Sequence, residues 1–148
     1  MSAEENKAML RAIYEECFNA HDLNAMDKYF APDYIEHSPE VPQPLDLQGF
    51  KNLFGMYLSA FPDARFTIEA VIGEGDMLAW RDTFTGTHQG ELMGIPPTGK
   101  SISITGVHYG RARAGKAVEH WAGVDTLGML QQLGVIPMMG AAPAGAGT

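Results

Sequence analysis

The sequence predicts a single α+β domain, in which three N-terminal helices wrap a curved antiparallel sheet and leave a cone-shaped pocket. Three observations lead to this fold class. The chain has 148 residues, which suffices for one domain with its own hydrophobic core. Apolar residues recur at helical spacing mostly before residue 62, whereas strand-like alternation starts at Ala64. Helices that precede a run of sequential strands are typical of helices packed on one face of a sheet.

Two helices are expected at the start of the chain. Ser2 and Glu5 have the form of a capping box, and the apolar residues that follow them at helical spacing predict a helix over residues 3–20. Asp22 is suited to cap a second, shorter helix over residues 23–30. Together these helices are expected to begin the cover of the sheet.

A short strand and the main covering helix come next. Residues 34–37 have a strand-like composition and predict a short edge strand. Residues 47–61 carry a broad apolar face at helical spacing, and Pro62 ends that helix.

The second half of the chain predicts an antiparallel meander. Turn sequences at residues 73–76 and 113–116 separate segments of alternating pattern. The predicted strands are residues 65–73, 77–88, 101–114 and 117–124. A short helix is expected over residues 126–133, so that the domain comprises residues 1–137, and residues 138–148 are expected to be a disordered tail.

Composition excludes several classes of partner. The formal net charge is −8, with only ten Lys and Arg residues, which disfavours binding to nucleic acid or to an anionic membrane. No apolar run approaches the roughly 20 residues that span a bilayer, and the N-terminus lacks the pattern of a secretory signal. A cytoplasmic protein is therefore expected. The single cysteine, Cys17, falls on an apolar helix stripe and is expected in the core.

One formal motif is rejected. Residues 94–101 match the spacing of a phosphate-binding P-loop. However, Pro96 and Pro97 remove two backbone donors, and the residues after Lys100 continue as a strand rather than as a helix. We expect no nucleotide site there.

The best carboxylate candidate follows the last predicted strand. Alternation places Trp121 and Asp125 on the same face of that strand. Asp125 is suited to acid–base chemistry beside an aromatic side chain, although it is equally suited to cap the short helix that follows. On the preceding strand, His108 shares a face with Ile104 and Gly106 and is expected at a similar height. A histidine near a carboxylate can relay a proton at neutral pH, but a hydrogen-bonded structural histidine is an equal alternative.

The long strand over residues 77–88 has polar groups on both faces. Trp80 and Asp82 share one face, whereas Arg81 lies on the other, and alternation alone does not decide which face lines a pocket. Arg81 is suited to polarise a substrate carbonyl or to pair with Asp125, and a surface salt bridge or dimer contact is the alternative.

A bound metal is not expected. No two of the five histidines form a close pair at helical ligand spacing, and no cysteine cluster assists them. His21 and His120 look like surface or rim residues.

Two segments give the sequence a family resemblance. Residues 86–100, GTHQGELMGIPPTGK, and residues 118–134, VEHWAGVDTLGMLQQLG, together resemble SnoaL-like polyketide cyclases and predicted ester cyclases. Residues 18–23, 34–37 and 61–63 also look like the family, and the resemblance extends over about residues 5–137.

The resemblance implies the fold of the nuclear-transport-factor-two-like superfamily, a cone-shaped α+β barrel that often dimerises through its sheet. It implies Asp125 as general acid/base of an intramolecular aldol cyclisation, with His108 in the pocket and Arg81 or His108 stabilising the oxyanion. No cofactor is required, and the expected partners are a small apolar carbonyl compound and a second copy of the chain. The side chains expected to bind substrate are Tyr34, His37, Tyr57, Phe61, His88, Met93 and Trp121.

Two other functions stay open at this stage. Asp82 departs from the apolar residue usual in relatives, so that Asp82 or Asp125 with Arg81 is compatible with an epoxide hydrolase or isomerase on the same scaffold. The abundance of methionine and aromatic residues also suits a non-catalytic, dimeric ligand-binding module.

Overall fold

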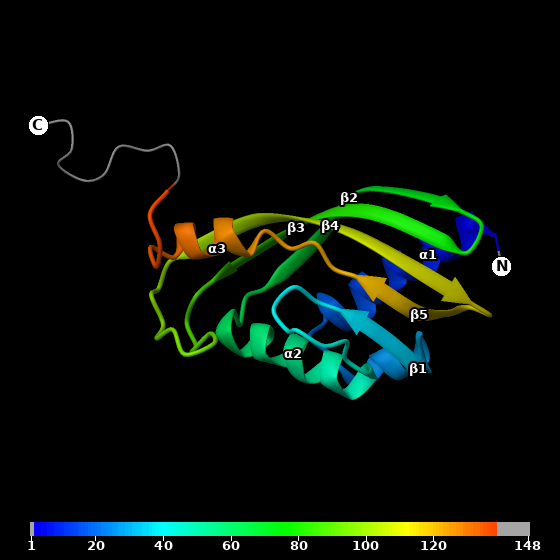
Figure 1. The fold of residues 1–148 in the computed structure, drawn as a ribbon, viewed down its shortest axis with the longest axis horizontal. Helices are drawn as coiled ribbons and strands as arrows, with labels where there is room; N and C mark the ends of the chain where they lie inside the picture. The colour runs from blue at the N-terminus through cyan, green and yellow to red at the C-terminus, as the bar shows by residue number, and fades with distance from the viewer. Residues whose placement is uncertain (1, 139–148) are drawn as a thin grey trace, which may run out of the picture.

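The computed structural model describes residues 2–138, which fold into a curved sheet with helices packed against its concave side (Figure 1). Helix α1, Ala3–Ile13, begins at Ser2, whose hydroxyl accepts a hydrogen bond from the backbone N–H of Glu5, as the capping box predicts. It continues without interruption into a π-helical turn, Tyr14–Phe18. Helix α2, Leu47–Ala60, is the predicted third helix and starts at the cap Asp46.

Within residues 2–138, five strands form one open sheet in the order β1-β5-β4-β3-β2. The strands are β1 Phe30–His37, β2 Arg65–Glu74, β3 Met77–Thr87, β4 Ser101–Arg113 and β5 Lys116–Trp121. The predicted meander is antiparallel from β2 to β5. Strand β1 joins β5 in parallel, so the sheet is mixed rather than wholly antiparallel. Tight turns fix the direction of neighbouring strands in the meander, but no turn connects β1 to its partner.

The predicted second helix is wrong beyond one turn. Only Asn24–Lys28 is helical, as a 3₁₀ turn, and Phe30 already belongs to β1. Pro32 lies inside that strand rather than ending a helix. An edge strand tolerates a proline because one row of its N–H groups makes no ladder bond. The pairing of β1 with β5 is also irregular between Phe30 and Ile35, on either side of this proline.

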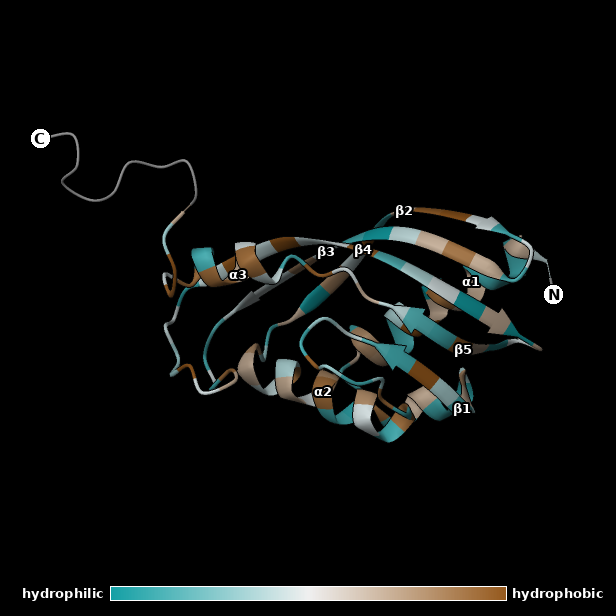
Figure 2. Cartoon of the chain, viewed as in Figure 1, coloured by the Kyte–Doolittle hydropathy of each residue, from teal (hydrophilic) through white to brown (hydrophobic). Residues whose placement is uncertain are grey.

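Strand alternation creates a buried inner face and an exposed outer face. Along β4 every second residue is buried, from Ile102 to Ala112, and the intervening residues are exposed. Figure 2 shows the corresponding bands of hydropathy along the long strands. The helices contribute several aromatic residues to the core, among them Phe18 and Phe50, which pack edge to face. The buried inner face therefore defines the interior of the cone.

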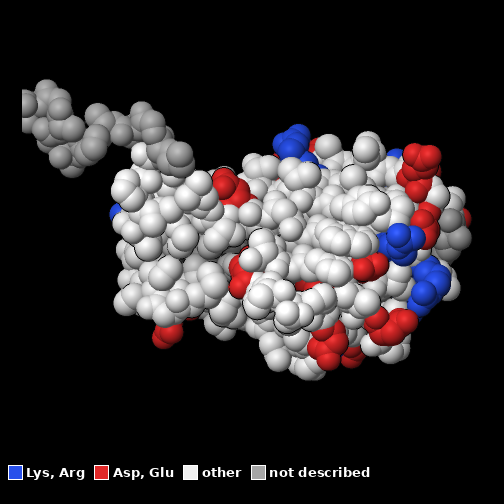
Figure 3. Space-filling view, in the orientation of Figure 1, with Lys and Arg blue, Asp and Glu red and all other residues white. Residues whose placement is uncertain are grey.

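The remaining segments lie outside this core. Helix α3, Thr126–Gln132, contacts β4. Strand β4 begins at Ser101, so the residues after Lys100 continue as a strand rather than as the helix that a P-loop needs. None of the helices within residues 2–138 has the length and apolar character needed to cross a membrane. On the face shown in Figure 3, the Lys and Arg side chains of the described residues form no continuous patch. The predicted tail lies outside the described residues except for Met138.

Candidate functional site

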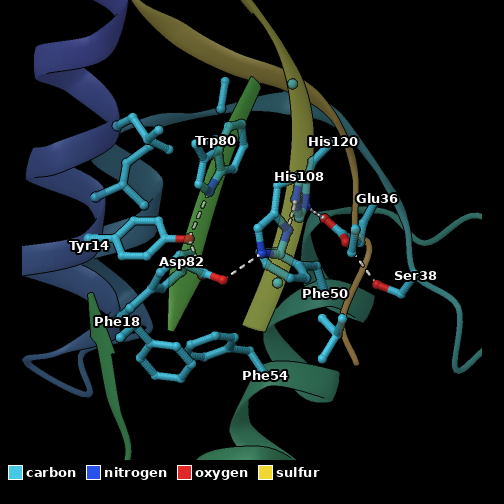
Figure 4. A pocket seen from close by; sticks show the side chains of 18 of the residues that line it. Tyr14, Phe18, Glu36, Ser38, Phe50, Phe54, Trp80, Asp82, His108 and His120 are labelled. Carbon is cyan, nitrogen blue, oxygen red and sulfur yellow. Dashed lines mark hydrogen bonds and ion pairs between the residues drawn. The ribbon is translucent and has the colours of Figure 1, made fainter. Parts of the chain in front are cut away.

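A largely apolar cavity lies between the helices and the inner face of the sheet. Helix α1 and the π-helical turn form one wall, α2 forms another, and inward side chains of all five strands complete it. Its apolar lining includes Ile13, Phe18, Phe50, Phe54, Phe84 and Ile104. Polar side chains also line this interior, and Figure 4 shows the hydrogen bonds that join several of them.

Asp82 brings a carboxylate to the cavity wall from the centre of β3. Its side chain is 7% exposed, and its Oδ2 accepts a hydrogen bond of 2.6 Å from the hydroxyl of Tyr14. The indole Nε1 of Trp80 donates in turn to that hydroxyl at 2.8 Å. Burial, followed by the nearby charge of Asp82, raises the pKa of Tyr14 well above its ordinary value, so the phenol stays protonated and donates. Tyr14 is thus a fixed donor to the Asp82 carboxylate.

His108 on β4 contacts the other oxygen of the same carboxylate. Its Nε2 lies 3.1 Å from Asp82 Oδ1. Asp82 pairs in register with Gly106 on β4, and a methyl group at Gly106 would collide with both Asp82 Oδ1 and His108 Nε2. The glycine therefore makes the space in which the acid and the imidazole meet.

A second histidine–carboxylate pair continues from the first. His120 on β5 lies opposite Glu36 on β1, and its Nδ1 is 2.7 Å from Glu36 Oε1. Tyr34 donates to the same oxygen at 2.5 Å, and Ser38 donates to Glu36 Oε2 at 2.7 Å. The two pairs are joined because His108 Nδ1 lies 3.0 Å from His120 Nε2. We call Asp82, His108, His120 and Glu36 the carboxylate–histidine chain; Figure 4 shows it crossing the cavity wall.

The cavity does not contain the two other residues expected to be catalytic. Asp125 is exposed, and its carboxylate accepts a hydrogen bond of 2.9 Å from Gly128 N, which is the helix-capping alternative. His120, Ala122 and Val124 line the cavity, so alternation turns Asp125 to the opposite side. Arg81 is exposed on the outer face for the same reason, because its neighbours Trp80 and Asp82 point inward.

The seven residues expected to bind substrate fall into four groups. Tyr34 and Tyr57 line the cavity. Phe61 and His88 are fully buried, but in the core rather than at the cavity, where their rings pack against each other. Met93 is 46% exposed, with a φ of 46°. His37 and Trp121 do not line the cavity; their rings stack with an interplanar angle of 7°, and His37 pairs with Glu119 at 2.8 Å.

Sequence reasoning missed half of the carboxylate–histidine chain. His120 was expected at the surface or rim, because Trp121 and Asp125 were assigned to the pocket face of β5. The signal that finds Glu36 is its alternation with Tyr34 along β1, since both side chains are buried on one face. Asp82 carried a similar signal, because it shares its face with Trp80 and Phe84. Within the described residues, no three His, Cys, Asp or Glu side chains are arranged to hold a metal ion.

Comparisons with known proteins agree on the family. The model of the family described as SnoaL-like polyketide cyclase matches residues 8–133. Nogalonic acid methyl ester cyclase from Streptomyces nogalater is 31% identical over 123 residues, which cover 79% of this chain and 89% of that protein. The aklanonic acid methyl ester cyclase DnrD from Streptomyces peucetius is 31% identical over 108 residues, which cover 72% of each.

Solved structures give the same result. AclR from Streptomyces galilaeus, for which a hydroxylase function has been suggested, superposes with a TM-score of 0.83 at 33% identity, covering 93% of this chain and 86% of AclR. IdmH from Streptomyces antibioticus, suggested to be a polyketide cyclase, superposes with a TM-score of 0.76 at 34% identity, covering 86% of this chain and 97% of IdmH. The chain therefore belongs to the SnoaL-like polyketide cyclase family.

Proposed function

We propose that this protein closes a ring in a neutral, carbonyl-bearing polyketide by an intramolecular aldol reaction, with Asp82 as the general base. The observation that carries the proposal is a buried carboxylate, held by Tyr14 and His108, in a largely apolar cavity. A carboxylate has about four lone-pair positions, of which these two partners occupy two. Asp82 thus retains the capacity to accept a proton from a bound molecule, whereas both ring nitrogens of His108 already have partners.

The reaction balances without a cofactor. Asp82 takes the proton from a carbon flanked by carbonyl groups, and the electron pair of the broken C–H bond forms an enolate. The enolate carbon attacks a ketone carbon of the same molecule, forming a C–C bond and an alkoxide. Asp82 then returns its proton to the alkoxide. The aromatic walls support this chemistry by holding the flexible substrate in a folded conformer and excluding water.

The charge of the cavity favours a neutral substrate. Glu36, Glu40, Asp82 and Glu119 are among its lining residues, and Arg111 is the single Lys or Arg residue in the described lining. A free substrate carboxylate would be repelled there, whereas a methyl ester would not. Two relatives are named as cyclases of methyl esters, which supports an ester substrate for this chain.

The proposal is tested with nogalonic acid methyl ester and aklanonic acid methyl ester as substrates and the corresponding free acids as comparisons. Ring closure gives a product of unchanged mass with a different chromatographic position, and the esters should react faster than the acids. Asp82→Asn should lower kcat by at least roughly 100-fold, the usual contribution of a general base. Asp125→Asn should retain near wild-type activity, since asparagine also caps helices well.

Three results would overturn the proposal. Full turnover by Asp82→Asn would exclude Asp82 as the base. A mass increase with incorporation of ¹⁸O from labelled water would identify a hydrolase instead. Tight binding of either ester with no product would support a binding module.

A further inference from the structure

The carboxylate–histidine chain contains more proton-binding groups than a single general base needs. Its three links measure 3.1 Å from Asp82 to His108, 3.0 Å between the two imidazoles, and 2.7 Å from His120 to Glu36. All four side chains are buried or nearly so: the side chain of Glu36 is 1% exposed, that of Asp82 7%, that of His108 8% and that of His120 14%. Bulk water therefore does not substitute for these contacts.

Counting protons across the links gives a definite result. An ionised carboxylate only accepts hydrogen bonds, so His108 Nε2 and His120 Nδ1 must each carry a proton. A neutral imidazole carries one ring proton, so neither ring would have a second. His108 Nδ1 and His120 Nε2 would then face each other as two lone pairs. The 3.0 Å contact between those nitrogens becomes a hydrogen bond only when a third proton lies between them.

We propose that the two imidazoles share one extra proton and that Glu36 is a positioning residue that keeps it there. The shared proton makes the histidine pair a single cation held between two carboxylates. That cation faces the Asp82 carboxylate and holds it in place, ready to accept a proton from the substrate. Glu36 acts through His120 and His108 and does not itself touch the reacting atoms. The catalytic consequence rests on the proposed function, whereas the shared proton does not.

The surroundings of Glu36 support its ionised state. Burial alone raises the pKa of this carboxyl, but the hydrogen bond from His120 and the charge of that ring oppose the effect. Hydrogen bonds from Tyr34 and Ser38 act in the same direction, and together they bring the pKa of Glu36 below its ordinary value. Burial raises the pKa of Tyr34 as well, so its phenol remains a donor.

Other charged and titratable groups of the cavity lie on several of the surrounding elements, whereas α1, β2 and α3 line it only with apolar residues. The π-helical turn contributes Tyr14, β1 Tyr34, the following loop Glu40, α2 Tyr57, β4 Arg111 and β5 Glu119. Three of these side chains have partners that do not belong to the carboxylate–histidine chain: Tyr57 donates to Glu40, Arg111 donates to Asp76, and Glu119 pairs with His37. Tyr14 and Tyr34 donate to the two carboxylates of the chain. Glu36 is thus the carboxylate that pairs directly with His120.

Nuclear magnetic resonance of protein labelled with ¹⁵N at histidine tests the shared proton without any substrate. We expect a scalar coupling between His108 Nδ1 and His120 Nε2 across their hydrogen bond, and three ring N–H signals from the two residues at pH 6–7. In Glu36→Gln the glutamine still accepts from His120, but one negative charge is gone. The shared proton should be lost, so that two ring signals remain and the coupling disappears.

Glu119→Gln is the matched control, because it removes the carboxylate of the other histidine–glutamate pair, 2.8 Å from His37. It should retain all three signals and the coupling, and Glu36→Asp should restore them in part. Two signals in the wild type, or three in Glu36→Gln, would overturn the inference. These outcomes are distinguishable from a failure of the proposed function. Absence of cyclisation with the coupling present would overturn only the proposed reaction. Cyclisation without the coupling would overturn only the shared proton.

Discussion

The two faces of the sheet use similar residues in different environments. On the inner face, the pairs Asp82–His108 and Glu36–His120 are buried and linked to each other. The pair His37–Glu119, whose glutamate borders the cavity, has a similar nitrogen–oxygen distance, but its two side chains are 31% and 26% exposed. A partly solvated ion pair contributes little to stability. Removing one member of a buried pair, by contrast, leaves the other as an uncompensated buried charge. The location of the pair, rather than its residue types, therefore determines what a substitution costs.

The largest difference between the two faces, in stability and in cyclase activity, is expected when adjacent residues of β4 are substituted. Gly106→Ala places a methyl group against Asp82 Oδ1 and His108 Nε2, which must separate. It should destabilise the protein by about 1–3 kcal/mol and abolish most of the cyclase activity. Val107→Ala changes an outward side chain that is 61% exposed and should alter stability by less than about 0.5 kcal/mol. Urea unfolding and the cyclisation assay measure both effects; equal stabilities of the two variants would contradict the comparison.

A difference in stability of similar size, but without a steric clash, is expected between removing a tyrosine hydroxyl from the cavity and removing one from the outer face of the sheet. Tyr14→Phe takes a donor from the buried Asp82 carboxylate and leaves Trp80 Nε1 without its acceptor. The expected cost is about 1.5–3 kcal/mol. Tyr109→Phe, on the outer face where Tyr109 is 47% exposed, should cost less than about 0.5 kcal/mol. Thermal unfolding of the two variants gives the comparison, and similar melting temperatures would show that the Tyr14 hydroxyl is not important.

The smallest effect is a change in acid sensitivity. Because the pKa of Glu36 is lowered in the folded protein, its ionised form stabilises the fold above the ordinary carboxyl pKa of about 4.3, and this stabilisation is lost as the pH falls through the lower folded value. Glu36→Gln should therefore be less stable than the wild type near pH 7, with a difference that shrinks below about pH 4.3. Urea unfolding from pH 7 to pH 3 measures this. Glu119→Gln serves as the control, and a difference for Glu36→Gln that stays constant with pH would contradict the assignment.

The order of elements and much of the inner face could be predicted from the sequence. Apolar periodicity located α1 and α2, and turn sequences located the four strands of the meander to within about a residue or two at most ends. The alternation of β4 correctly placed Ile104, Gly106 and His108 on one face. These features depend on residues that are close in sequence. Local propensity failed at Phe30, where pairing with β5 outweighed a helical pattern that was too short to fold alone.

The contacts of the candidate site were decided by the tertiary structure. His108 and Asp82 are 26 residues apart, and His120 and Glu36 are 84 apart. Their meeting depends on strand register and on the parallel pairing of β1, neither of which is encoded by a local turn. Alternation separates Trp121 and Asp125 from His120 but does not decide which face of β5 lines the pocket, which is why Asp125 and Trp121 were expected in the pocket where His120 lies. The sequence by itself thus determined which side chains alternate, and only the packing of β1 against β5 decided which of them form the site.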